Sequence, residues 1–353
     1  MSSLAIIILN WNGWKDTCEC LSSIMLNSYT NYHILLIDNG SSDHSVDRIR
    51  QWAAGKMQII PGPFHSEKMQ YSVPLKELSS RQIKSVNYNK ADVLKHKLIL
   101  IKNPDNIGFS AGANIGIQHA LDLGLNYIFL LNNDTTISPD CLSQIMSTIK
   151  ENAKIRVLTP LILYYNEPHI IWYFGGKLTF TGRRAIYYQN RRLNKLRPLK
   201  PKRVTFVSGC ALFVDAHIFR DFGLLTERFF FGEEDYEFSL RMKKYKIPIH
   251  ATPGAVVYHK VGRSNRKFFD SDRLPYMFIG FLNRFINKKN HTRFIQYWYI
   301  LRLICMSYII PKLIVMHKYS FAQIKSFTVL LMEYSSNMTS VDKNTLIKAK
   351  QIL

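Results

Sequence analysis

The sequence predicts an α/β fold built on a parallel sheet, followed by a C-terminal region of different composition. Up to about residue 152, short aliphatic runs typical of buried strands alternate with segments of helical periodicity. Three of these runs are followed directly by polar, turn-forming residues. Basic residues then dominate two later segments, 183–203 and 276–353, which do not continue the alternation, and the first of them is expected to be a basic loop.

Two strand–helix pairs open the chain. The β-branched run 4–9 predicts a buried strand, and residues 16–27 predict a helix whose apolar side chains lie on one stripe. A second strand is expected over 34–37, and a second helix through residues 46–52. This order of elements is typical of parallel strands connected by helices.

Two further pairs follow an interruption. Residues 61–97 contain three prolines and no clear period, which predicts an inserted loop. Strands are expected over 98–101 and 127–131, and helices through 117–121 and 139–152.

Composition limits the class of protein. The chain has 353 residues, of which 47% are apolar and 13% aromatic, so it can bury a core and is not a disordered chain. Its 47 Lys and Arg against 25 Asp and Glu give a net charge of +22, which indicates a nucleic acid, a phospholipid surface or a phosphorylated substrate as a partner. Five scattered cysteines, with no C-x-x-C pair, argue against a disulfide framework or a structural zinc site.

No segment is expected to target the chain or to span a membrane. The run 4–9 is too short for a signal peptide. Residues 294–316 are apolar, but Arg302 and Lys312 interrupt them. The basic residues of this region and its aromatic run 297–299 fit either an anionic membrane surface or helices packed on the rest of the chain.

Three polar clusters follow predicted strands: Asn10 with Asn12, residues 38–43, and residues 132–134. Open α/β sheets bind ligands at the carboxyl ends of their strands, so one shared cleft would gather all three clusters. The alternative is that each cluster only forms a turn.

Glycines after the third strand do not form a known phosphate-binding motif. Gly108, Gly112 and Gly116 are spaced by four, so both the dinucleotide fingerprint and the P-loop are absent. This spacing argues against hydride transfer and P-loop hydrolysis, although glycine still permits close approach of the backbone to a ligand.

Acidic and imidazole side chains are the candidates for chemistry. Asp134, in a run of oxygen-bearing side chains, is a candidate ligand for Mg²⁺ or Mn²⁺. The run Glu233-Glu234-Asp235, at the start of a predicted helix, either supplies a general base or caps the helix. His259 follows a strand-like segment and is either a ligand or a structural residue.

The order of these clusters resembles the family-2 inverting glycosyltransferases of the GT-A fold, particularly bacterial rhamnosyl- and galactofuranosyltransferase-like enzymes of surface polysaccharide assembly. The resemblance covers roughly residues 4–265 and implies a nucleotide-binding mixed sheet flanked by helices, with a C-terminal helical extension. The motifs that carry it are residues 6–13, 38–43, 106–114, 131–134, 207–209, 234–235 and 258–259.

The resemblance assigns roles to the matching residues. Asp235 would be the general base that deprotonates the acceptor hydroxyl, with Glu234 beside it. Asp134 and His259 would bind the divalent cation that bridges the donor diphosphate. Asp38 would contact the base or ribose of the nucleotide, and Asn132 the ribose. Trp172, Gly175 and Gly176 would form a wall on the donor or acceptor side. The whole nucleotide-sugar site would comprise Asn10, Asn12, Asp38, Asn39, Asp43, Asn106, Gly108, Gly112, Asn132, Asn133, Trp172 and Gly176.

The implied activity is transfer of one hexosyl or deoxyhexosyl group from a UDP- or dTDP-sugar to a glycan or lipid-linked diphosphate acceptor, as in O-antigen or capsule synthesis. Residues 1–275 would form the catalytic domain, and 276–353 a basic helical region at the inner face of the cell membrane. The metal motif has one acid, Asp134, where many relatives have two or three. The Q-x-x-R-W motif of the processive synthases is absent from the sequence, which favours addition of a single sugar over polymerisation.

Two alternative functions remain. A sugar-phosphate nucleotidyltransferase would share the nucleotide cleft and the metal, but it would carry a Gly-rich basic loop where residues 10–13 stand. A nucleic-acid-binding protein would interleave its aromatic residues with Lys and Arg, whereas here they gather in apolar runs. We therefore expect no nucleic-acid partner.

Overall fold

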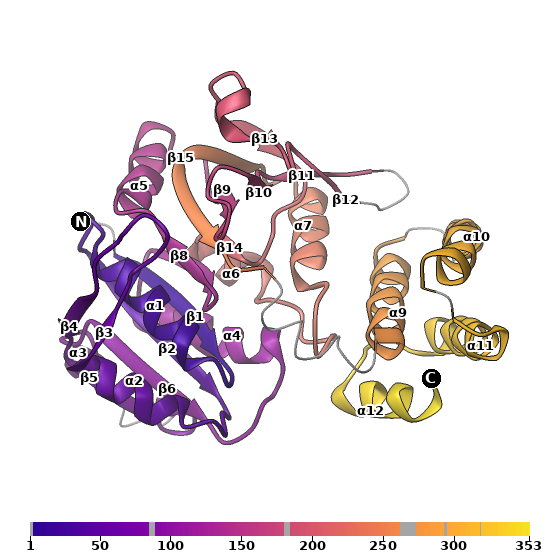
Figure 1. The fold of residues 1–353 in the computed structure, drawn as a ribbon, viewed down its shortest axis with the longest axis horizontal. Coiled ribbons are helices and arrows are strands. Elements are labelled where there is room, and N and C mark those ends of the chain that lie inside the picture. Colours follow the sequence, from indigo (N-terminus) through magenta and orange to yellow (C-terminus); the bar gives the residue numbers. More distant parts are fainter. Residues whose placement is uncertain (1–2, 85–88, 180–183, 262–272, 293–294, 318) are drawn as a thin grey trace.

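A mixed sheet of eleven strands forms the centre of the molecule (Figure 1). The computed structural model describes residues 3–84, 89–179, 184–261, 273–292, 295–317 and 319–353. In sheet order the strands are β13 Lys202–Val204, β15 Ile249–His259, β9 Val157–Tyr164, β14 Ala211–Asp215, β7 Tyr127–Asn132, β1 Leu4–Asn10, β2 Tyr32–Asn39, β6 Leu98–Asn103 and β5 Leu75–Ser79, with β10 Ile171–Tyr173 beside β9 and β8 Thr135–Ile137 beside β15.

The five strands from β7 to β5 run parallel, and β14 joins β7 in the antiparallel sense. The predicted parallel sheet is thus confirmed for the first half of the chain, and the mixed sheet of the GT-A fold for the whole. The register pairs Asn10 of β1 with Asp38 of β2, and Leu9 with Asn132 of β7. Asn10, Asp38 and Asn132, three of the predicted polar residues, therefore lie at the same edge of the sheet.

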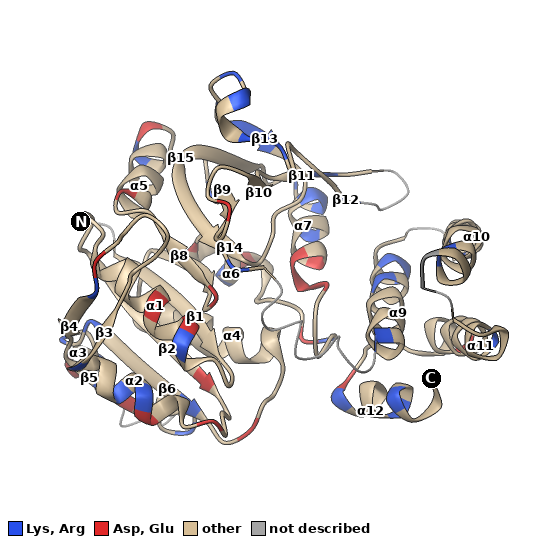
Figure 2. Cartoon of the chain, in the orientation of Figure 1, with Lys and Arg blue, Asp and Glu red and all other residues tan. Residues whose placement is uncertain are grey.

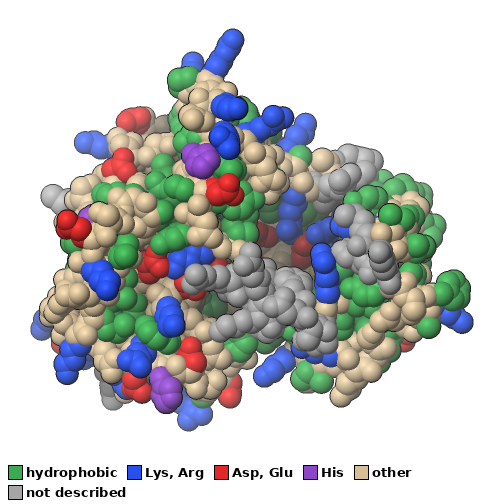
Figure 3. Space-filling model, viewed as in Figure 1, with side chains coloured by type: hydrophobic (Ala, Val, Ile, Leu, Met, Phe, Trp, Pro, Cys, Tyr) green, Lys and Arg blue, Asp and Glu red, His purple; other side chains and the backbone are tan. Residues whose placement is uncertain are grey.

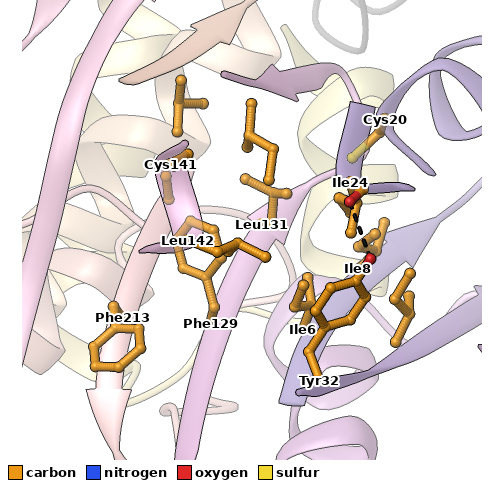
Figure 4. Packing of buried hydrophobic residues seen from close by; sticks show 14 of the residues in the cluster. Ile6, Ile8, Cys20, Ile24, Tyr32, Phe129, Leu131, Cys141, Leu142 and Phe213 are labelled. Carbon is orange, nitrogen blue, oxygen red and sulfur yellow. Dashed lines mark hydrogen bonds between the residues drawn. The ribbon is translucent and has the colours of Figure 1, made fainter. Parts of the chain in front are cut away.

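Helices cover both faces of the sheet, because alternate strand residues point to opposite sides. Side chains such as Ile6, Ile8 and Phe129 pack under α1, α2 and α5, and part of this layer is shown in Figure 4. Ile7 and Ile128 pack on the other face under α4, α6 and α7. Burial on both faces explains why the strands read as unbroken apolar runs. The helices are α1 Trp14–Met25, α2 Ser45–Ala53, α3 Lys90–Val93, α4 Phe109–Asp122, α5 Cys141–Glu151, α6 Ala216–Phe222 and α7 Glu234–Lys244.

Two expected loops contain regular structure. In segment 61–97, β4 (Met69–Ser72) pairs with β3 (Ala54–Ile59), and β5 extends the main sheet beside β6. The prediction of a plain loop was wrong there because these short edge strands are only partly buried and lack an apolar run. The gap 85–88 lies outside the described residues.

Basic segment 183–203 likewise contains paired strands. β12 (Arg184–Ile186) pairs with β11 (Gly176–Leu178), and β13 later pairs with β15. Arg183 lies outside the described residues. The segment is therefore not a plain loop, and its first described residue belongs to an ordered strand.

Four helices form the C-terminal region: α9 Arg273–His291, α10 Ile295–His317, α11 Phe321–Asn337 and α12 Lys343–Ile352. They enclose a separate apolar cluster that includes Phe278, Phe285 and Phe327. Among the described helices, α10 is long and apolar enough over 295–315 to cross a membrane by length and composition, with 33% of the window buried. Our expectation that Arg302 and Lys312 exclude such a stretch does not hold by that criterion. The division of the chain at residue 275 stays a prediction.

Candidate active site

Hydrogen bonds join the loops that follow β1 and β2. The amide of Asn10 donates to Asp38 Oδ1 at 2.8 Å and to Ser41 Oγ at 3.1 Å. Thr17 of α1 donates to Asn10 Oδ1 at 2.7 Å, and the backbone N–H of Ser41 donates to Asp38 Oδ2 at 3.1 Å. Asn10 and Asp38 are both buried, so their positions are fixed before any ligand arrives.

Asn12 and Asp43 hold turns. Asn12 has a positive φ of 50°, and its side-chain oxygen accepts from the N–H of Ser42 at 2.8 Å. Asp43 accepts from the N–H of Ser45 at 3.1 Å and from the Ser45 hydroxyl at the start of α2. For these two residues the structure therefore shows the turn-forming role that was the alternative to ligand binding.

Asn39 and Asn106 bind each other at the next strand end. The Asn39 amide donates to Asn106 Oδ1 at 3.0 Å and to the Gly108 carbonyl at 3.1 Å. Gly108 has a φ of 91°, and a Cβ there would lie 2.6 Å from the carbonyl oxygen of Phe230. At Gly112 a Cβ would lie 2.6 Å from Leu9 Cδ1. Backbone conformation and packing therefore require glycine at Gly108, whereas a side chain at Gly112 would have to displace the side chain of Leu9.

The segment 132–134 leads from the sheet edge into the site. Asn132 ends β7, and the amide of Asn133 donates to Thr17 Oγ1 at 3.0 Å, which ties this segment to the loop after β1. β8 follows at once and pairs antiparallel with the end of β15, where His259 stands opposite Thr135. This pairing brings Asp134 and His259 together from positions 125 residues apart in the sequence.

Asp134 and His259 form a buried pair. His259 Nε2 lies 3.3 Å from Asp134 Oδ1. Burial alone would raise the pKa of Asp134, but the hydrogen bond and charge of His259 lower it overall. Burial also disfavours the charged imidazole, yet Cys210 and Asp134 raise the pKa of His259 to about 10. The ring of Trp172 meets the imidazole edge-on at 4.4 Å between centroids, so Trp172 orients His259.

Asp134 and His259 supply two of the ligands that a divalent cation needs, and a bound substrate would have to supply the others. Within the described residues there is no group of three His, Cys, Asp or Glu side chains that could hold a metal ion. His259 Nε2 faces Asp134 Oδ1 at 3.3 Å, so a cation bound between them would replace the proton that the imidazole holds there, and Asp134 offers a hard carboxylate. Two protein ligands are what a cation needs when the phosphates of a substrate complete its coordination. The donor set therefore fits Mg²⁺ or Mn²⁺ held jointly with a diphosphate.

Lys260, which sequence analysis did not single out, anchors the strand that carries His259. Its ammonium group lies 2.6 Å from Asp16 Oδ1 and also contacts Glu19, both on α1. All three side chains are at most 15% exposed. Lys260 thus holds the end of β15 against the helix that follows the Asn10 loop. No motif marks it, because its partners lie more than 240 residues away.

Asp235 faces the site from the first turn of α7. Its Oδ2 accepts from the N–H of Gly209 at 3.3 Å. A Cβ on Gly209 would lie 3.5 Å from Glu234 Oε1 and 3.7 Å from Asp235 Cβ, so the backbone at Gly209 packs directly beside both acids. Figure 2 shows these acidic residues at the start of α7.

Arg184 neutralises the acidic run. Its Nη2 lies 2.8 Å from Glu233 Oε1 and 3.7 Å from Asp235 Oδ1. The guanidinium lies over the rings of Phe206 and Tyr236, at 4.9 and 5.2 Å. Gly176, predicted as part of the donor wall, lies on the partner strand of this hairpin, where a Cβ would approach Phe206 to 3.0 Å. Sequence analysis missed Arg184 because it is one of nine basic residues in 183–203.

Residues 208–210 connect the two halves of the site. Gly209 donates to Asp235, and the carbonyl of Cys210 accepts from the N–H of Asn132 at 2.9 Å. Burial raises the pKa of the Cys210 thiol; His259 lowers it, while Asp134 and Asp235 raise it further. The Asp134–His259 pair and Asp235 therefore all lie within electrostatic reach of this short segment.

Glu234 is the acid whose protonation is most perturbed. Burial and the adjacent Asp235 raise its pKa from 4.5 to about 8, while Arg184 acts in the opposite direction. The folded state thus retains a proton that the unfolded state releases near pH 4.5. This term stabilises the protein fully below pH 4.5, and its contribution is lost as the pH rises to about 8.

We therefore expect Glu234→Gln to change the pH dependence of stability. The free energy of unfolding of the variant, relative to the unchanged protein, should rise between pH 5 and pH 8 and level off above, as Glu234 titrates. Urea unfolding at several pH values measures this difference. A difference independent of pH would contradict the raised pKa of Glu234.

Arg184→Gln should destabilise the protein and slow catalysis. Among the described residues, the change leaves Arg284, at 3.6 Å, as the remaining ion-pair partner of the buried Glu233, at a cost of about 3 kcal/mol. Since Arg184 also contacts Asp235, we expect a lower kcat with little change in donor affinity. Lys195→Gln, an exposed change in the same basic segment, is the control for thermal unfolding and turnover. Equal effects of both changes would show that only the charge of the segment matters.

Comparisons with known proteins identify the family to which the chain belongs. Residues 127–338 match Glycosyl transferase family group 2, and residues 5–67 match Glycosyl transferase family 2. The first match alone covers more than half of the chain. The protein therefore belongs to the family 2 glycosyltransferases, and it is a glycosyltransferase.

A curated relative and two solved structures are similar to the chain. The low-salt glycan biosynthesis hexosyltransferase Agl10 of Haloferax volcanii is 27% identical over 187 residues, which are 53% of this chain and 58% of that protein. The structure of GalNAc-T7 with UDP, GalNAc and Mn²⁺ matches with a TM-score of 0.51 and 16% identity, over 73% of this chain and 44% of that one. The structure of S. aureus TarS matches with a TM-score of 0.50 and 11% identity, over 99% of this chain and 53% of that one. Together these structures confirm the GT-A fold.

Proposed function

We propose that the protein transfers a single sugar from a nucleotide-diphosphate sugar to a hydroxyl group of its acceptor, with inversion at the anomeric carbon. The observation that carries the proposal is the meeting of two unlike groups at residues 208–210. On one side lies the Asp134–His259 pair, which suits a cation on a diphosphate. On the other side lies Asp235, a carboxylate able to accept a proton.

Asp235 is proposed as the general base. A sugar hydroxyl attacks slowly unless its proton is removed in the transition state, and a carboxylate held by Gly209 and Arg184 is oriented for that removal. Glu234, whose pKa is raised to about 8, is mostly protonated at neutral pH and is less suited to the task. Attack from the side opposite the leaving group inverts the anomeric centre.

Asp134 and His259 would hold Mg²⁺ or Mn²⁺ on the donor diphosphate. When bound, the cation stabilises the charge that develops on the leaving diphosphate. The residues themselves fix where that diphosphate lies, because β8 and β15 are paired at this point and Trp172 orients the imidazole. The Mn²⁺ and UDP of the GalNAc-T7 structure support this choice of ligands by analogy of fold.

The nucleoside would lie against the loops after β1, β2 and β7. Asp38 and Asn10, both buried and already hydrogen-bonded, present a rigid edge to the base or ribose of a UDP- or dTDP-linked donor. Asn132 would contact the ribose. The amide pair Asn39 and Asn106 fixes the next loop, and Asn133 closes the site towards α1.

The acceptor is proposed to be a lipid-linked diphosphate glycan of a surface polysaccharide such as O-antigen or capsule, with a rhamnosyl- or galactofuranosyl-type donor. The chain spans 58% of the length of the Haloferax volcanii hexosyltransferase, and that protein's role in glycan biosynthesis supports the general pathway. The net charge of +22 suits an anionic acceptor and an anionic membrane surface. The enzyme would then act in the cytoplasm, at the inner face of the cell membrane.

The proposed function is tested by incubating the purified protein with a panel of nucleotide sugars. A bound donor should raise the melting temperature by mass action. With Mn²⁺ and a suitable acceptor, turnover should release a nucleoside diphosphate. Release of pyrophosphate from a nucleoside triphosphate and a sugar phosphate would instead establish a nucleotidyltransferase.

A further inference from the structure

The outer side of α10 is as apolar as its packed side. Residues Trp298, Leu301, Met306, Ile309 and Leu313 are at most 6% exposed, and the last three belong to the apolar cluster of the C-terminal helices. The opposite side carries apolar residues that are more than half exposed and recur at helical spacing. These residues, the outer face of α10, are Ile300, Leu303, Ile304, Tyr308, Ile314 and Val315.

Exposure of this kind extends to the neighbouring helix. Phe321 and Val329 of α11 are 84% and 55% exposed. Figure 3 shows hydrophobic side chains gathered over the C-terminal helices. A helix that is apolar all round is normally buried, and a contiguous apolar surface of this extent marks an interaction site.

Charge indicates which surface covers the outer face. α10 contains no Asp or Glu, and Lys312 lies one turn after Tyr308. On α11 the exposed Lys325 lies between Phe321 and Val329. Residues 276–353 carry eleven Lys and Arg against two acids. A second copy of the face would bring basic groups against basic groups, whereas anionic lipid headgroups complement them.

Internal contacts fix the orientation of α10. The guanidinium of Arg302 donates to Met332 O and Ser335 Oγ of α11, at 3.1 and 3.2 Å, and lies over the Trp298 ring. Trp298 Nε1 donates to the carbonyl of Phe285 on α9 at 2.9 Å. A helix that crossed the bilayer would leave these partners, so α10 must stay beside α9 and α11 and offer only its outer face.

We infer that α10 lies in the plane of an anionic membrane surface, with its outer face inserted among the lipids and Lys312 and Lys325 at the headgroups. Tyr308, with an apolar ring and a polar hydroxyl, suits the boundary between them. The inference deepens the proposed function, on which it rests, because it names the surface through which the enzyme reaches a lipid-linked acceptor.

Vesicle sedimentation of the full chain tests this inference. The protein should bind vesicles of phosphatidylcholine with about 30% phosphatidylglycerol more strongly than phosphatidylcholine alone. The double change Leu303→Glu/Ile304→Glu should raise the lipid concentration for half-binding at least about tenfold. The control Ile347→Glu/Ile352→Glu, which adds the same charge to exposed apolar positions of α12, should bind as the unchanged protein does.

A single change at Lys312 tests the inference with a variant that is expected to fold normally. Lys312→Glu should weaken binding to anionic vesicles and leave the melting temperature unchanged. Equal binding of all variants, or no preference for anionic lipid, would overturn the inference. A dimer that forms without lipid and that Leu303→Glu/Ile304→Glu dissociates would also overturn it, because the outer face of α10 would then bind a second copy of the chain. Resistance of the membrane-bound protein to extraction with alkaline carbonate would overturn it as well, because that result would indicate a spanning helix. Turnover on a water-soluble acceptor is measured in parallel, so failure of the proposed function is seen separately.

Discussion

Asp235→Asn should abolish sugar transfer while donor binding persists. The substitution keeps the size of the side chain but removes its ability to accept a proton, and loss of a general base lowers kcat by about 10²–10⁴-fold. Asp235 contacts Gly209 and Arg184 rather than the Asp134–His259 pair, so donor affinity should change less than about threefold. Turnover and donor titration calorimetry on the same preparation measure the two effects.

Glu234→Gln is the matched comparison for Asp235→Asn. It alters the adjacent carboxyl group, which is already mostly protonated at neutral pH because burial and Asp235 raise its pKa to about 8. We therefore expect Glu234→Gln to retain most of the activity at pH 7. If Glu234→Gln were inactive and Asp235→Asn active, the proton would be taken by Glu234 and our assignment would be wrong.

Asp134→Ala should remove the metal dependence of donor binding. The carboxylate of Asp134 is the hard ligand of the proposed cation site, so without it Mn²⁺ should no longer tighten the binding of UDP or dTDP. Since loss of even an outer-shell partner costs about 10–100-fold in metal affinity, loss of the ligand itself should weaken metal-dependent donor binding by at least about tenfold. Calorimetric titration of the nucleoside diphosphate with Mn²⁺ and with EDTA measures this effect in both proteins.

Asp122→Ala provides the control for Asp134→Ala, since Asp122 is an exposed acid at the end of α4. Its donor affinity should respond to Mn²⁺ as that of the unchanged protein does. Equal affinity of the unchanged protein with and without EDTA would count against a metal role for Asp134 and His259.

The sheet edge could be predicted because its strands are buried on both faces. Runs such as 4–9 and 34–37 are unmistakable in the sequence, and parallel strands end at one edge. The placement of Asn10, Asp38 and Asn132 near one another followed from those two facts. Which polar residue makes a turn and which faces a ligand did not follow, and Asn12 and Asp43 are used in turns.

Contacts between distant segments could not be predicted from local pattern. Arg184 reaches Glu233 and Asp235 across about 50 residues, and Lys260 reaches Asp16 across 244. The edge strand β5 is only half-buried, and its pairing with β6 uses backbone groups that carry no sequence signal. In α10 the packed side and the outer side are both apolar, so the sequence could not indicate which side is exposed in the folded chain.

We propose that one crevice holds a donor diphosphate at Asp134 and His259 and an acceptor hydroxyl at Asp235. The most direct measurement is a crystal structure of the protein grown with UDP and Mn²⁺, in which anomalous scattering locates the metal. We expect one metal peak about 2.2 Å from a carboxylate oxygen of Asp134, with His259 as a ligand and the terminal phosphate directed towards Asp235. A metal bound instead at the acidic run of α7, or UDP bound away from the loops after β1, β2 and β7, would contradict it.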